Sequence, residues 1–440
     1  KSLEDTGEFD VITGEIIGDT DQAKSEAQKM KASGVEATVF NIPVWIFPSF
    51  PVIAANEAPG PYLLFSDLNP RYPGMVGMLA TAGAFDMLGI QYGRAWGDIE
   101  DPSVLRKAVV FLRASTSVNR LKGETFGLFG GRPMGMYTAA ADPALWQRRF
   151  GIDVEHTDQW EIVRRSPEIP SDKVDRALKW LESHVKRVLY DGRQLTPEKL
   201  KQQIRSYYVV RRIIEEKHLD FIGIKAQPEL TDNFATMDLT EAFLNDPYDW
   251  DGPHEPIVAA TEADMDGALT MQVLHHITGD PVLFADVRHY DADGAFFDLC
   301  NSGSQATYFA GRSRDPAVNL KNVELYPQGF YFPAGGASVR SIAAPGEVTI
   351  ARFCRKKDGE YWLAIIPATF LDLGDEAEKK AEATQVEWPH AFARLRVPAD
   401  DFLGSYGSNH CHAVYGDWSE ELVWVARILG IDYTVFRAEK

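Results

Sequence analysis

The sequence predicts an α/β protein with two Rossmann-like α/β domains followed by a β-rich, barrel-like C-terminal domain. Three observations predict this fold class. The chain has 440 residues, too many for one compact core. Helical and strand-like segments alternate over residues 1–280, as in parallel sheets with crossover helices. From residue 281 onward, short apolar runs separated by turns dominate, as in antiparallel β domains.

The first predicted domain covers residues 1–121. Its aromatic, proline-rich segment 45–51 follows a run that alternates apolar and polar residues. The first residue is Lys1 rather than Met, so we expect the domain to lack its first strand here. The patterns predict a strand over 35–44 and helices over 21–33, 75–87 and 102–121.

The second predicted domain covers residues 122–280 and carries Glu262. Short buried strands in it alternate with longer amphipathic helices, which indicates a parallel sheet. The patterns predict strands over 125–129, 221–224 and 257–260, and helices over 143–150, 171–189, 196–217 and, after Glu262, through Ile277.

The third predicted domain covers residues 281–440 and carries Asp286 and His410. The charged run 372–380 is predicted to be a solvated loop, and 417–429 a helix. The short apolar runs predict strands over 282–286, 295–300, 329–332, 348–355, 361–370 and 431–436.

Charge and cysteine content exclude several classes of partner. The formal charge is −19, from 45 basic and 64 acidic side chains, so we expect no nucleic-acid and no membrane partner. No run of 18 apolar residues and no recognisable signal peptide occurs. The three cysteines form no CxxC pair, which disfavours a disulfide framework and favours a reducing, cytoplasmic location.

Two carboxylates stand at the ends of predicted buried strands. Glu262 follows the strand over 257–260, and Asp286 ends the strand that begins at 282. Ligands of open α/β sheets bind at the carboxyl ends of strands. A buried carboxylate is costly unless it is paired or bound to a metal. The simpler alternatives are that Glu262 caps the following helix and that Asp286 pairs with Arg288.

A glycine-rich segment, 404–416, supplies the third element of a candidate metal site. It carries Asn409, His410 and His412. Two carboxylates and one imidazole make an oxygen-rich site suited to Mn²⁺ or Mg²⁺, with positions left open for a chelating substrate. His275 and His276 are predicted to be core or surface residues rather than ligands.

Residues 301–304 follow a buried strand and offer hydroxyls and amides to a sugar. A plain turn is the alternative, and the same holds for residues 335–338. Neither segment matches the phosphate-binding pattern GxxxxGK[ST].

Residues 260–288, ATEADMDGALTMQVLHHITGDPVLFADVR, resemble the L-fucose isomerase family, which includes enzymes that act on D-arabinose. The spacing between the two acids is similar to that of the family. The resemblance covers nearly the whole chain, loosely outside its clearest blocks. Further matching blocks are 71–74, 248–252, 301–304, 335–338 and 407–410.

The resemblance implies an intramolecular oxidoreductase, a ketol isomerase that interconverts an aldose and its 2-ketose through an enediol. Glu262 and Asp286 match the family's two carboxylates, which bind the metal and act as acid and base, and His410 matches the third ligand. The expected metal is Mn²⁺, with Mg²⁺ and Co²⁺ as alternatives.

The resemblance also implies residues that contact the sugar, and a hexamer with active sites at subunit interfaces. Trp45 matches an aromatic residue that the family lends to the active site of a neighbouring subunit. The other implied sugar contacts are Lys225, Ser302, Tyr331, Trp388 and Asn409.

Lys225 departs from the family pattern, because the L-fucose enzymes carry a glutamine there that contacts the sugar. A cation suggests an anionic substrate such as a sulfonated hexose (sulfoquinovose). The alternative is that Lys225 turns away and Gln227 takes its place. Two other departures are Tyr406, where an indole is common, and the missing first strand, which supplies an arginine in the family.

Three functions therefore compete. The first is isomerisation of a neutral aldose of the L-fucose or D-arabinose type, and the second is isomerisation of an anionic sugar. The third is a non-enzymatic sugar-binding protein. That class does not need Glu262, Asp286 and His410 together and normally carries an export signal.

Overall fold

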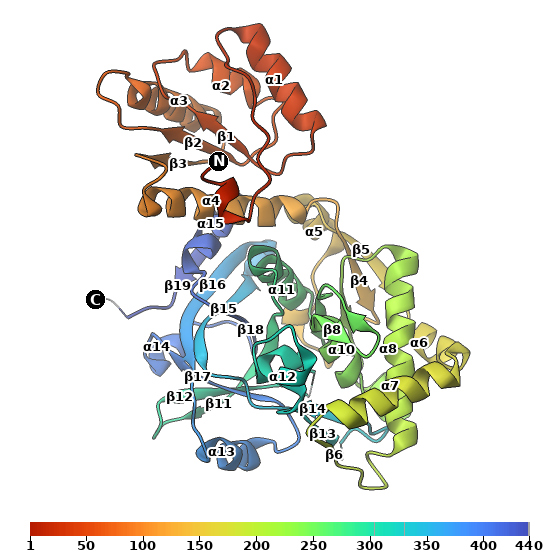
Figure 1. Cartoon of the computed structure of the whole chain (residues 1–440). Coiled ribbons are helices and arrows are strands. Elements are labelled where there is room, and N and C mark those ends of the chain that lie inside the picture. The colour runs from red at the N-terminus through yellow and green to blue at the C-terminus, as the bar shows by residue number, and fades with distance from the viewer. Residues whose placement is uncertain (303, 330, 439–440) are drawn as a thin grey trace. The chain divides into compact units, whose positions relative to one another are not determined.

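The computed structural model describes residues 1–302, 304–329 and 331–438, which form a mixed α/β protein with parallel sheets and one large mixed sheet (Figure 1). The chain divides into two compact units, residues 1–122 with 420–431 and residues 123–419 with those from 432 onward. The second unit includes residue 280, so the division expected there stays a prediction. Among the described residues, no helix is long and apolar enough to cross a membrane.

The first unit is built on a parallel sheet of three strands in the order β1-β2-β3. Leu63 and Leu64 of β2 point to opposite faces, Leu63 into a core with α4 and Leu64 into a core with α3. Helix α4 begins at Asp101, whose side chain accepts a hydrogen bond from Ser103 N, with Pro102 in the first turn. The elements are β1 (Thr38–Asn41), β2 (Tyr62–Ser66), β3 (Tyr92–Trp96), α1 (Thr20–Ala32), α2 (Ser49–Ala54), α3 (Gly74–Leu88) and α4 (Pro102–Arg120).

Helix α15 (Ser419–Leu429) completes the core of the first unit from the far end of the sequence (Figure 1). Trp424 of this helix packs edge-on against Phe111 of α4, with ring centroids 5.0 Å apart. Arg113 of α4 also pairs with the buried Glu421, at 3.1 Å. Residues more than 300 positions apart therefore share one core.

The second unit contains a parallel sheet in the order β10-β7-β4-β5. The first strand of this unit, β4, thus lies between the second and the third, and the switch point of the sheet falls between β4 and β7. The strands are β4 (Thr125–Phe129), β5 (Asp153–Thr157), β7 (Phe221–Ile224) and β10 (Ala259–Thr261); the helices are α5 (Pro143–Phe150), α6 (Trp160–Arg165), α7 (Ser171–His184), α8 (Pro197–Lys217), α9 (Glu229–Asn233), α10 (Asp238–Asn245) and α11 (Met265–Thr278).

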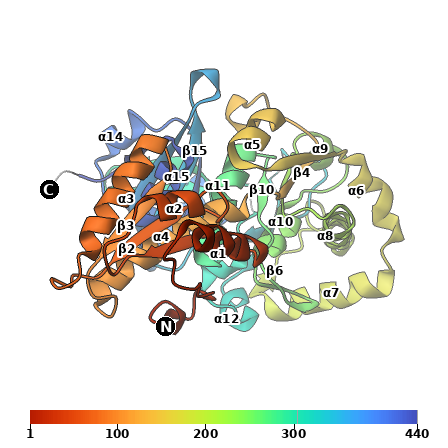
Figure 2. The same ribbon diagram turned by 90° about the horizontal axis from the view of Figure 1, so that it is seen from above.

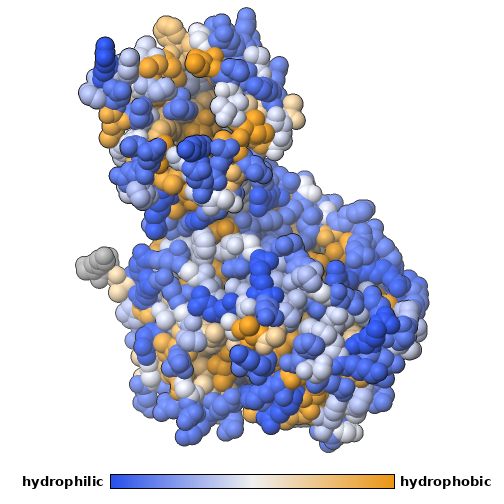
Figure 3. Space-filling view, in the orientation of Figure 1, coloured by the Kyte–Doolittle hydropathy of each residue, from blue (hydrophilic) through white to orange (hydrophobic). Residues whose placement is uncertain are grey.

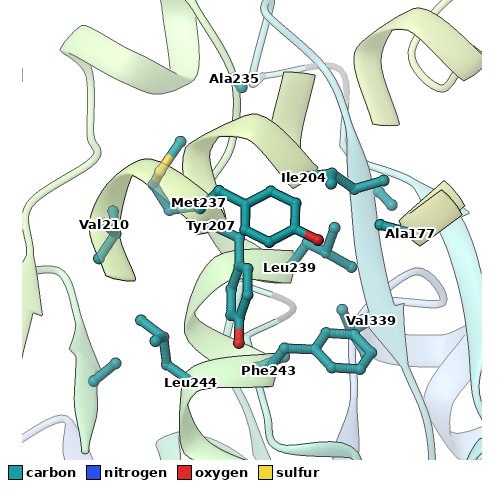
Figure 4. Packing of buried hydrophobic residues seen from close by; sticks show 14 of the residues in the cluster. Ala177, Ile204, Tyr207, Val210, Ala235, Met237, Leu239, Phe243, Leu244 and Val339 are labelled. Carbon is teal, nitrogen blue, oxygen red and sulfur yellow. The ribbon is translucent and has the colours of Figure 1, made fainter. Parts of the chain in front are cut away.

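The largest apolar core of this unit lies around α8 and α10. Tyr207 and Ile204 of α8 pack with Met237 and with Phe243 of α10 (Figure 4). Figure 2 views α8 along its axis, with α10 beside it. This core fixes α10, whose first residues lie next to the candidate site.

A seven-stranded mixed sheet has the order β15-β18-β11-β12-β17-β16-β19, and β15 also pairs with β16 along its whole length. All its pairings are antiparallel except that of β16 with β19. Helix α11 packs against β15 and β18 as well as against β7 and β10, so it joins the two sheets. The strands are β11 (Leu283–Asp291), β12 (Phe296–Cys300), β15 (Gly346–Arg355), β16 (Tyr361–Phe370), β17 (His390–Leu395), β18 (His410–Tyr415) and β19 (Asp432–Val435).

Smaller elements complete the second unit. One small sheet has the order β14-β13-β6, and β8 pairs with β9. The elements are β6 (Arg187–Val188), β8 (Tyr248–Asp249), β9 (Gly252–Pro253), β13 (Glu324–Pro327), β14 (Ala337–Arg340), α12 (Pro316–Leu320), α13 (Glu376–Thr384) and α14 (Ala399–Leu403).

Four predicted elements are wrong. The strand expected to end at Asp286 continues to Asp291 as β11, because its second half pairs with β12. The helix over 171–189 ends at His184, because residues 187–188 pair with β13. The loop over 372–380 contains the start of α13, whose Ala377 and Ala381 are buried against the mixed sheet. The strand over 329–332 is a turn in which Phe332 N donates to Gly329 O, and Phe330 lies outside the described residues.

Candidate active site

Glu262 lies in a strained turn between β10 and α11. Glu262 and Ala263 have φ angles of 58° and 47°, in the left-handed region that costs a residue with a side chain roughly 1–2 kcal/mol. Gly223 of β7 makes room for this turn, because a Cβ there would lie 3.0 Å from Ala263 Cα. Asp264, rather than Glu262, caps the helix, and its Oδ1 accepts from Gly267 N at 3.0 Å. The turn therefore leaves Glu262 available for another role.

Asp286 and His410 are direct cross-strand neighbours. Strand β11 pairs antiparallel with β18, and the register places Asp286 opposite His410. Arg288, the simpler partner expected for Asp286, instead lies over the ring of Trp388, 5.4 Å from its centroid. The mixed sheet thus sets one carboxylate beside one imidazole.

The structure brings the three predicted metal ligands together. His410 Nε2 lies 3.0 Å from Glu262 Oε2 and 3.5 Å from Asp286 Oδ1. The imidazole has no exposed surface, and its Nε2 has no hydrogen-bond partner among the described residues. A buried nitrogen without a partner, aimed at two carboxylates, needs a proton or a cation between them.

The residues present fit a divalent cation. As they stand, no three His, Cys, Asp or Glu side chains in the described part of the chain surround a space for a metal ion, since the carboxylates contact the imidazole directly. Adjacent ligands of an octahedral ion, each about 2.1 Å from it, lie about 3 Å apart. The two distances from Nε2, 3.0 and 3.5 Å, are close to this value. Two carboxylates and one imidazole also suit Mn²⁺ or Mg²⁺.

The electrostatics of the site make a proton and a cation compete. Desolvation lowers the pKa of His410, but the hydrogen bond to Asp264 and the negative charges of Asp264 and Glu262 outweigh it and raise the pKa to about 9. Desolvation raises the pKa of Asp286; the charge of His410 opposes this rise and that of Glu262 adds to it. The imidazole is therefore protonated at neutral pH, and a cation must displace that proton.

Asp264 and Arg352 hold the His410 imidazole on the side away from Glu262 and Asp286. Neither residue was predicted from the sequence. Asp264 Oδ2 accepts a hydrogen bond from His410 Nδ1 at 2.6 Å. The buried Arg352 guanidinium contacts both oxygens of Asp264, with Nη2 to Oδ1 at 3.0 Å. Desolvation raises the pKa of Asp264, but Arg352 and His410 hold it well below its usual range. A carboxylate that binds the far nitrogen is the usual support of a metal-binding histidine.

Asn301 and Asn409 hold the carboxylate of Asp286. Asn301 Nδ2 donates to one oxygen at 2.9 Å, and Asn409 Nδ2 donates to the other at 3.1 Å. The predicted sugar contact Ser302 donates its N–H and its hydroxyl to Asn301 Oδ1, at 2.6 and 2.9 Å. Gly303 of the same predicted segment lies outside the described residues.

Tyr331 and Trp388, two predicted sugar contacts, lie edge to face with ring centroids 6.1 Å apart. The side chain of Gln328 joins Trp388 to Ser302. Its Oε1 accepts from the indole N–H of Trp388 at 2.8 Å, and its Nε2 donates to Ser302 O at 2.7 Å. Gln328 is not among the site residues predicted from the sequence.

Lys225 follows β7, next to the strand that ends before Glu262. Its side chain lines a cleft of about 650 Å³ at the switch point of the sheet, with Gly130, Thr157 and Trp160 among the other lining residues. Nζ pairs with Glu229 Oε1 at 2.5 Å. The charge of Lys225 is therefore met by Glu229, and none of the described residues that line the cleft is a predicted metal ligand. The alternative that Gln227 takes the place of Lys225 at the sugar stays a prediction.

Trp45 belongs to the first unit, in the segment between β1 and α2, and is 46% exposed. Gly74 and Gly77 of α3 let this segment pack closely, because a Cβ at Gly77 would lie 3.1 Å from Val44 O and 3.2 Å from Ile46 N. The role predicted for Trp45 in a neighbouring subunit stays a prediction.

The chain is similar to L-fucose isomerases along its length. Models of that enzyme's first N-terminal, second N-terminal and C-terminal domains match residues 3–123, 216–279 and 299–437. The L-fucose isomerase of Haemophilus influenzae is 25% identical over 96% of this chain and 83% of that protein. The L-fucose isomerase of Streptococcus pneumoniae is 25% identical over 96% of this chain and 84% of that protein.

Proposed function

Since the chain belongs to the L-fucose isomerase family and is therefore a ketol isomerase, we propose that it interconverts an aldose and its 2-ketose with a divalent cation held by Glu262, Asp286 and His410. The cation is Mn²⁺, with Mg²⁺ or Co²⁺ as alternatives. The observation that carries the proposal is the buried His410 Nε2, which faces Glu262 directly after β10 and Asp286 within β11.

The reaction moves a proton between two neighbouring carbons through an enediol. When bound, the cation supplies charge stabilisation to the two sugar oxygens, worth several kcal/mol. Glu262 and Asp286 divide the roles of base and acid, an effect of roughly 100- to 10,000-fold. Burial raises the pKa of Asp286, which suits a carboxyl that takes up and returns a proton.

The remaining residues orient these groups and the sugar. Asp264 fixes His410 with Nε2 toward the carboxylates, and Asn301 and Asn409 hold both oxygens of Asp286. Ser302, Tyr331 and Trp388 bind the sugar, because a hydroxyl and two aromatic rings suit its polar edge and its apolar face.

A neutral aldose of the L-fucose or D-arabinose type is the first candidate substrate. It is supported by the ion pair of Lys225 with Glu229, which leaves no unmatched positive charge for an anion. The second candidate is an anionic sugar such as a sulfonated hexose. It is favoured by the place of Lys225 directly after Ile224, which pairs with Thr261, the residue before Glu262, and it requires the sugar's anion to replace Glu229.

The third alternative, a non-enzymatic sugar-binding protein, does not suit a member of an isomerase family. A cytoplasmic location stays a prediction, supported by three buried cysteines that are all free thiols.

We further propose a homo-oligomer, a hexamer, whose active sites lie at subunit interfaces and include Trp45 of a neighbour. Helix α3 is apolar on all sides, a character expected of a buried helix, yet five of its large apolar side chains are exposed. Figure 3 shows apolar side chains on the surface of this unit. A second copy of the chain would cover these residues, which are Met75, Val76, Leu79, Met87 and Leu88.

A panel of neutral and sulfonated aldoses tests the proposal, with ketose formation as the readout. Chelation should abolish turnover, and Mn²⁺ should restore it. Turnover that survives chelation would exclude the metal, and a panel without any ketose would exclude the assigned substrates. The ratio of neutral to sulfonated turnover decides between the two candidate sugars.

A further inference from the structure

Gln328 follows β13 and is 2% exposed, and every hydrogen-bonding atom of its amide has a partner. Nε2 donates to Asp238 Oδ2 at 3.0 Å and to Ser302 O at 2.7 Å. Oε1 accepts from Trp388 Nε1 at 2.8 Å and from its neighbour Gly329 N at 2.9 Å. One amide thus joins α10, the segment after β12 and the segment before β17.

We propose that Gln328, anchored by Asp238, is the positioning residue of the sugar site. It sets the plane of the Trp388 indole and the place of Ser302 relative to Asp286. This inference rests on the proposed function, since Trp388 and Ser302 are assigned there as sugar contacts. Gln328 itself acts only through these neighbours.

The partners of Gln328 decide which way its amide points. A carboxylate accepts hydrogen bonds and an indole N–H only donates them. Asp238 therefore draws Nε2 to itself and leaves Oε1 for Trp388. A flipped amide would set two donors against each other at Trp388 and two acceptors at Ser302 O, so a single orientation is stable.

The same network reaches a proposed metal ligand. Nε2 of Gln328 holds Ser302 O, Ser302 donates to Asn301, and Asn301 donates to Asp286. A continuous chain of hydrogen bonds therefore runs from the aromatic sugar contact to the carboxylate. Loss of the Gln328 amide should weaken sugar binding more than it displaces Asp286, because Asp286 keeps its hydrogen bonds from Asn301 and Asn409.

The test compares Gln328→Met with a matched control, Gln203→Met. Gln203 of α8 is also buried and bonds the backbone of Ala337 and the side chain of Thr236. Thr236 in turn bonds Asp238, but among the described residues none of these three bonds Trp388 or Ser302. Both changes remove buried amide bonds and keep the volume. We expect Gln328→Met to raise KM about tenfold or more with a smaller fall in kcat. Gln203→Met, with a similar loss in Tm, should leave KM within about twofold.

A double-mutant cycle with Trp388→Phe tests the coupling, because phenylalanine has no N–H to position. The effect of Gln328→Met on KM should shrink at least threefold in the Trp388→Phe background. Equal KM values in the Gln328→Met and Gln203→Met enzymes, or effects that multiply fully in the cycle, would overturn the inference.

A readout without turnover separates this inference from the proposed function. The difference between the ultraviolet resonance Raman spectra of the wild type and Trp388→Phe isolates the Trp388 indole, whose band reports N–H hydrogen bonding. Gln328→Met should shift this band and Gln203→Met should not; an unshifted band overturns the inference. If the wild type makes no ketose from any aldose, the proposed function fails, and the spectra still decide whether Gln328 positions Trp388.

Discussion

His410 donates its Nδ1 proton to Asp264 Oδ2 over 2.6 Å, and neither side chain has exposed surface. This bond leaves Nε2 as the nitrogen that faces Glu262 and Asp286. The buried Arg352 in turn neutralises Asp264. The geometry of the proposed ligands is thus determined by the supporting residues Asp264 and Arg352 as well as by the ligands themselves.

The substitution Asp264→Asn should weaken Mn²⁺ binding about 10- to 100-fold, because the imidazole loses its charged support. It should also destabilise the fold by about 3–5 kcal/mol, since Arg352 is left buried without its partner. Mn²⁺ titration and urea unfolding measure the two effects. Asp266→Asn is the control, because Asp266 is as buried but pairs with Arg355 and Tyr361. Equal Mn²⁺ affinities in the two variants would contradict the support role of Asp264.

The substitution Gly223→Ala should disturb the turn that carries Glu262. Its Cβ would lie 3.0 Å from Ala263 Cα and 3.0 Å from Phe126 Cζ, closer than packed atoms normally approach. We expect a destabilisation of about 1–3 kcal/mol and a fall in kcat. Gly131→Ala is the matched control, because a Cβ there meets nothing within 4 Å. A Gly223→Ala enzyme with unchanged kcat would show that Glu262 tolerates displacement.

Asp238 should make the unfolding free energy depend on pH. Burial raises its pKa to about 7, although hydrogen bonds from Thr236 and Gln328 oppose the rise. An unfolded aspartate titrates near about 3.9, so between about pH 4 and 7 only the folded chain keeps the proton. The stability from this group is therefore complete below about pH 4 and is lost as the pH rises to about 7.

The variant Asp238→Asn removes this titration. Its unfolding free energy, relative to the wild type, should rise with pH between about 4 and 7 by up to about 1.4 kcal/mol per unit and then stay level. Urea unfolding at several pH values measures it. Asp400→Asn, in which the acid replaced is exposed, serves as the control. A difference that does not vary with pH would show that Asp238 stays ionised in the folded chain.

The pair Lys225–Glu229 should distinguish the two candidate substrates. If the sugar is neutral, Lys225→Gln should change kcat/KM for the best neutral aldose by less than about tenfold, because Glu229 already meets the lysine's charge. If the sugar is anionic, loss of the cation should cost a sulfonated aldose about 2–5 kcal/mol, or roughly 30- to 4,000-fold. The kcat/KM values of Lys225→Gln on a neutral and on a sulfonated aldose, each relative to the wild type, decide between the two substrates. Glu229→Gln, which removes the carboxylate that pairs with Lys225, is measured beside it.

The exposed side of α3 should hold the subunits together. Leu79 is 51% exposed within the chain, so Leu79→Glu should leave each chain folded while it breaks an apolar interface. Sedimentation velocity should show a shift to smaller species. Ile16→Glu changes another exposed apolar residue of the same unit, at 91% exposure but outside α3, and should leave the assembly intact. An unchanged sedimentation coefficient for Leu79→Glu would exclude this helix from the interface.

The elements that local patterns define could be predicted from the sequence. Strands 125–129, 221–224 and 361–370 have the predicted bounds, because each is an apolar run between turn residues. Strand β6 could not be predicted, since its two residues are ordered by pairing with β13, where Arg187 and Arg340 surround the buried Glu324. Such pairing depends on residues far apart in the chain.

The proposed metal ligands could be predicted for a similar reason, but the residues that hold them in place could not. Glu262 directly follows the recognisable strand β10, Asp286 lies within β11, whose first residues are an apolar run, and His410 was identified through the family resemblance. Arg352 lies 88 positions from Asp264, and its own strand gives no sign that it binds there. Gln328 reads locally as an ordinary turn residue, because only the folded chain brings Asp238, Ser302 and Trp388 around it.

The place of α15 in the first unit bears on how the chain matures on the ribosome. Trp424 covers Phe111, so the first 122 residues leave an apolar face of α4 open until the last part of the chain has been made. Domains generally fold as they emerge, N-terminal first. The first unit instead cannot complete its core until α15 has been synthesised. Nascent chains should therefore depend on chaperones that bind exposed apolar surface until then.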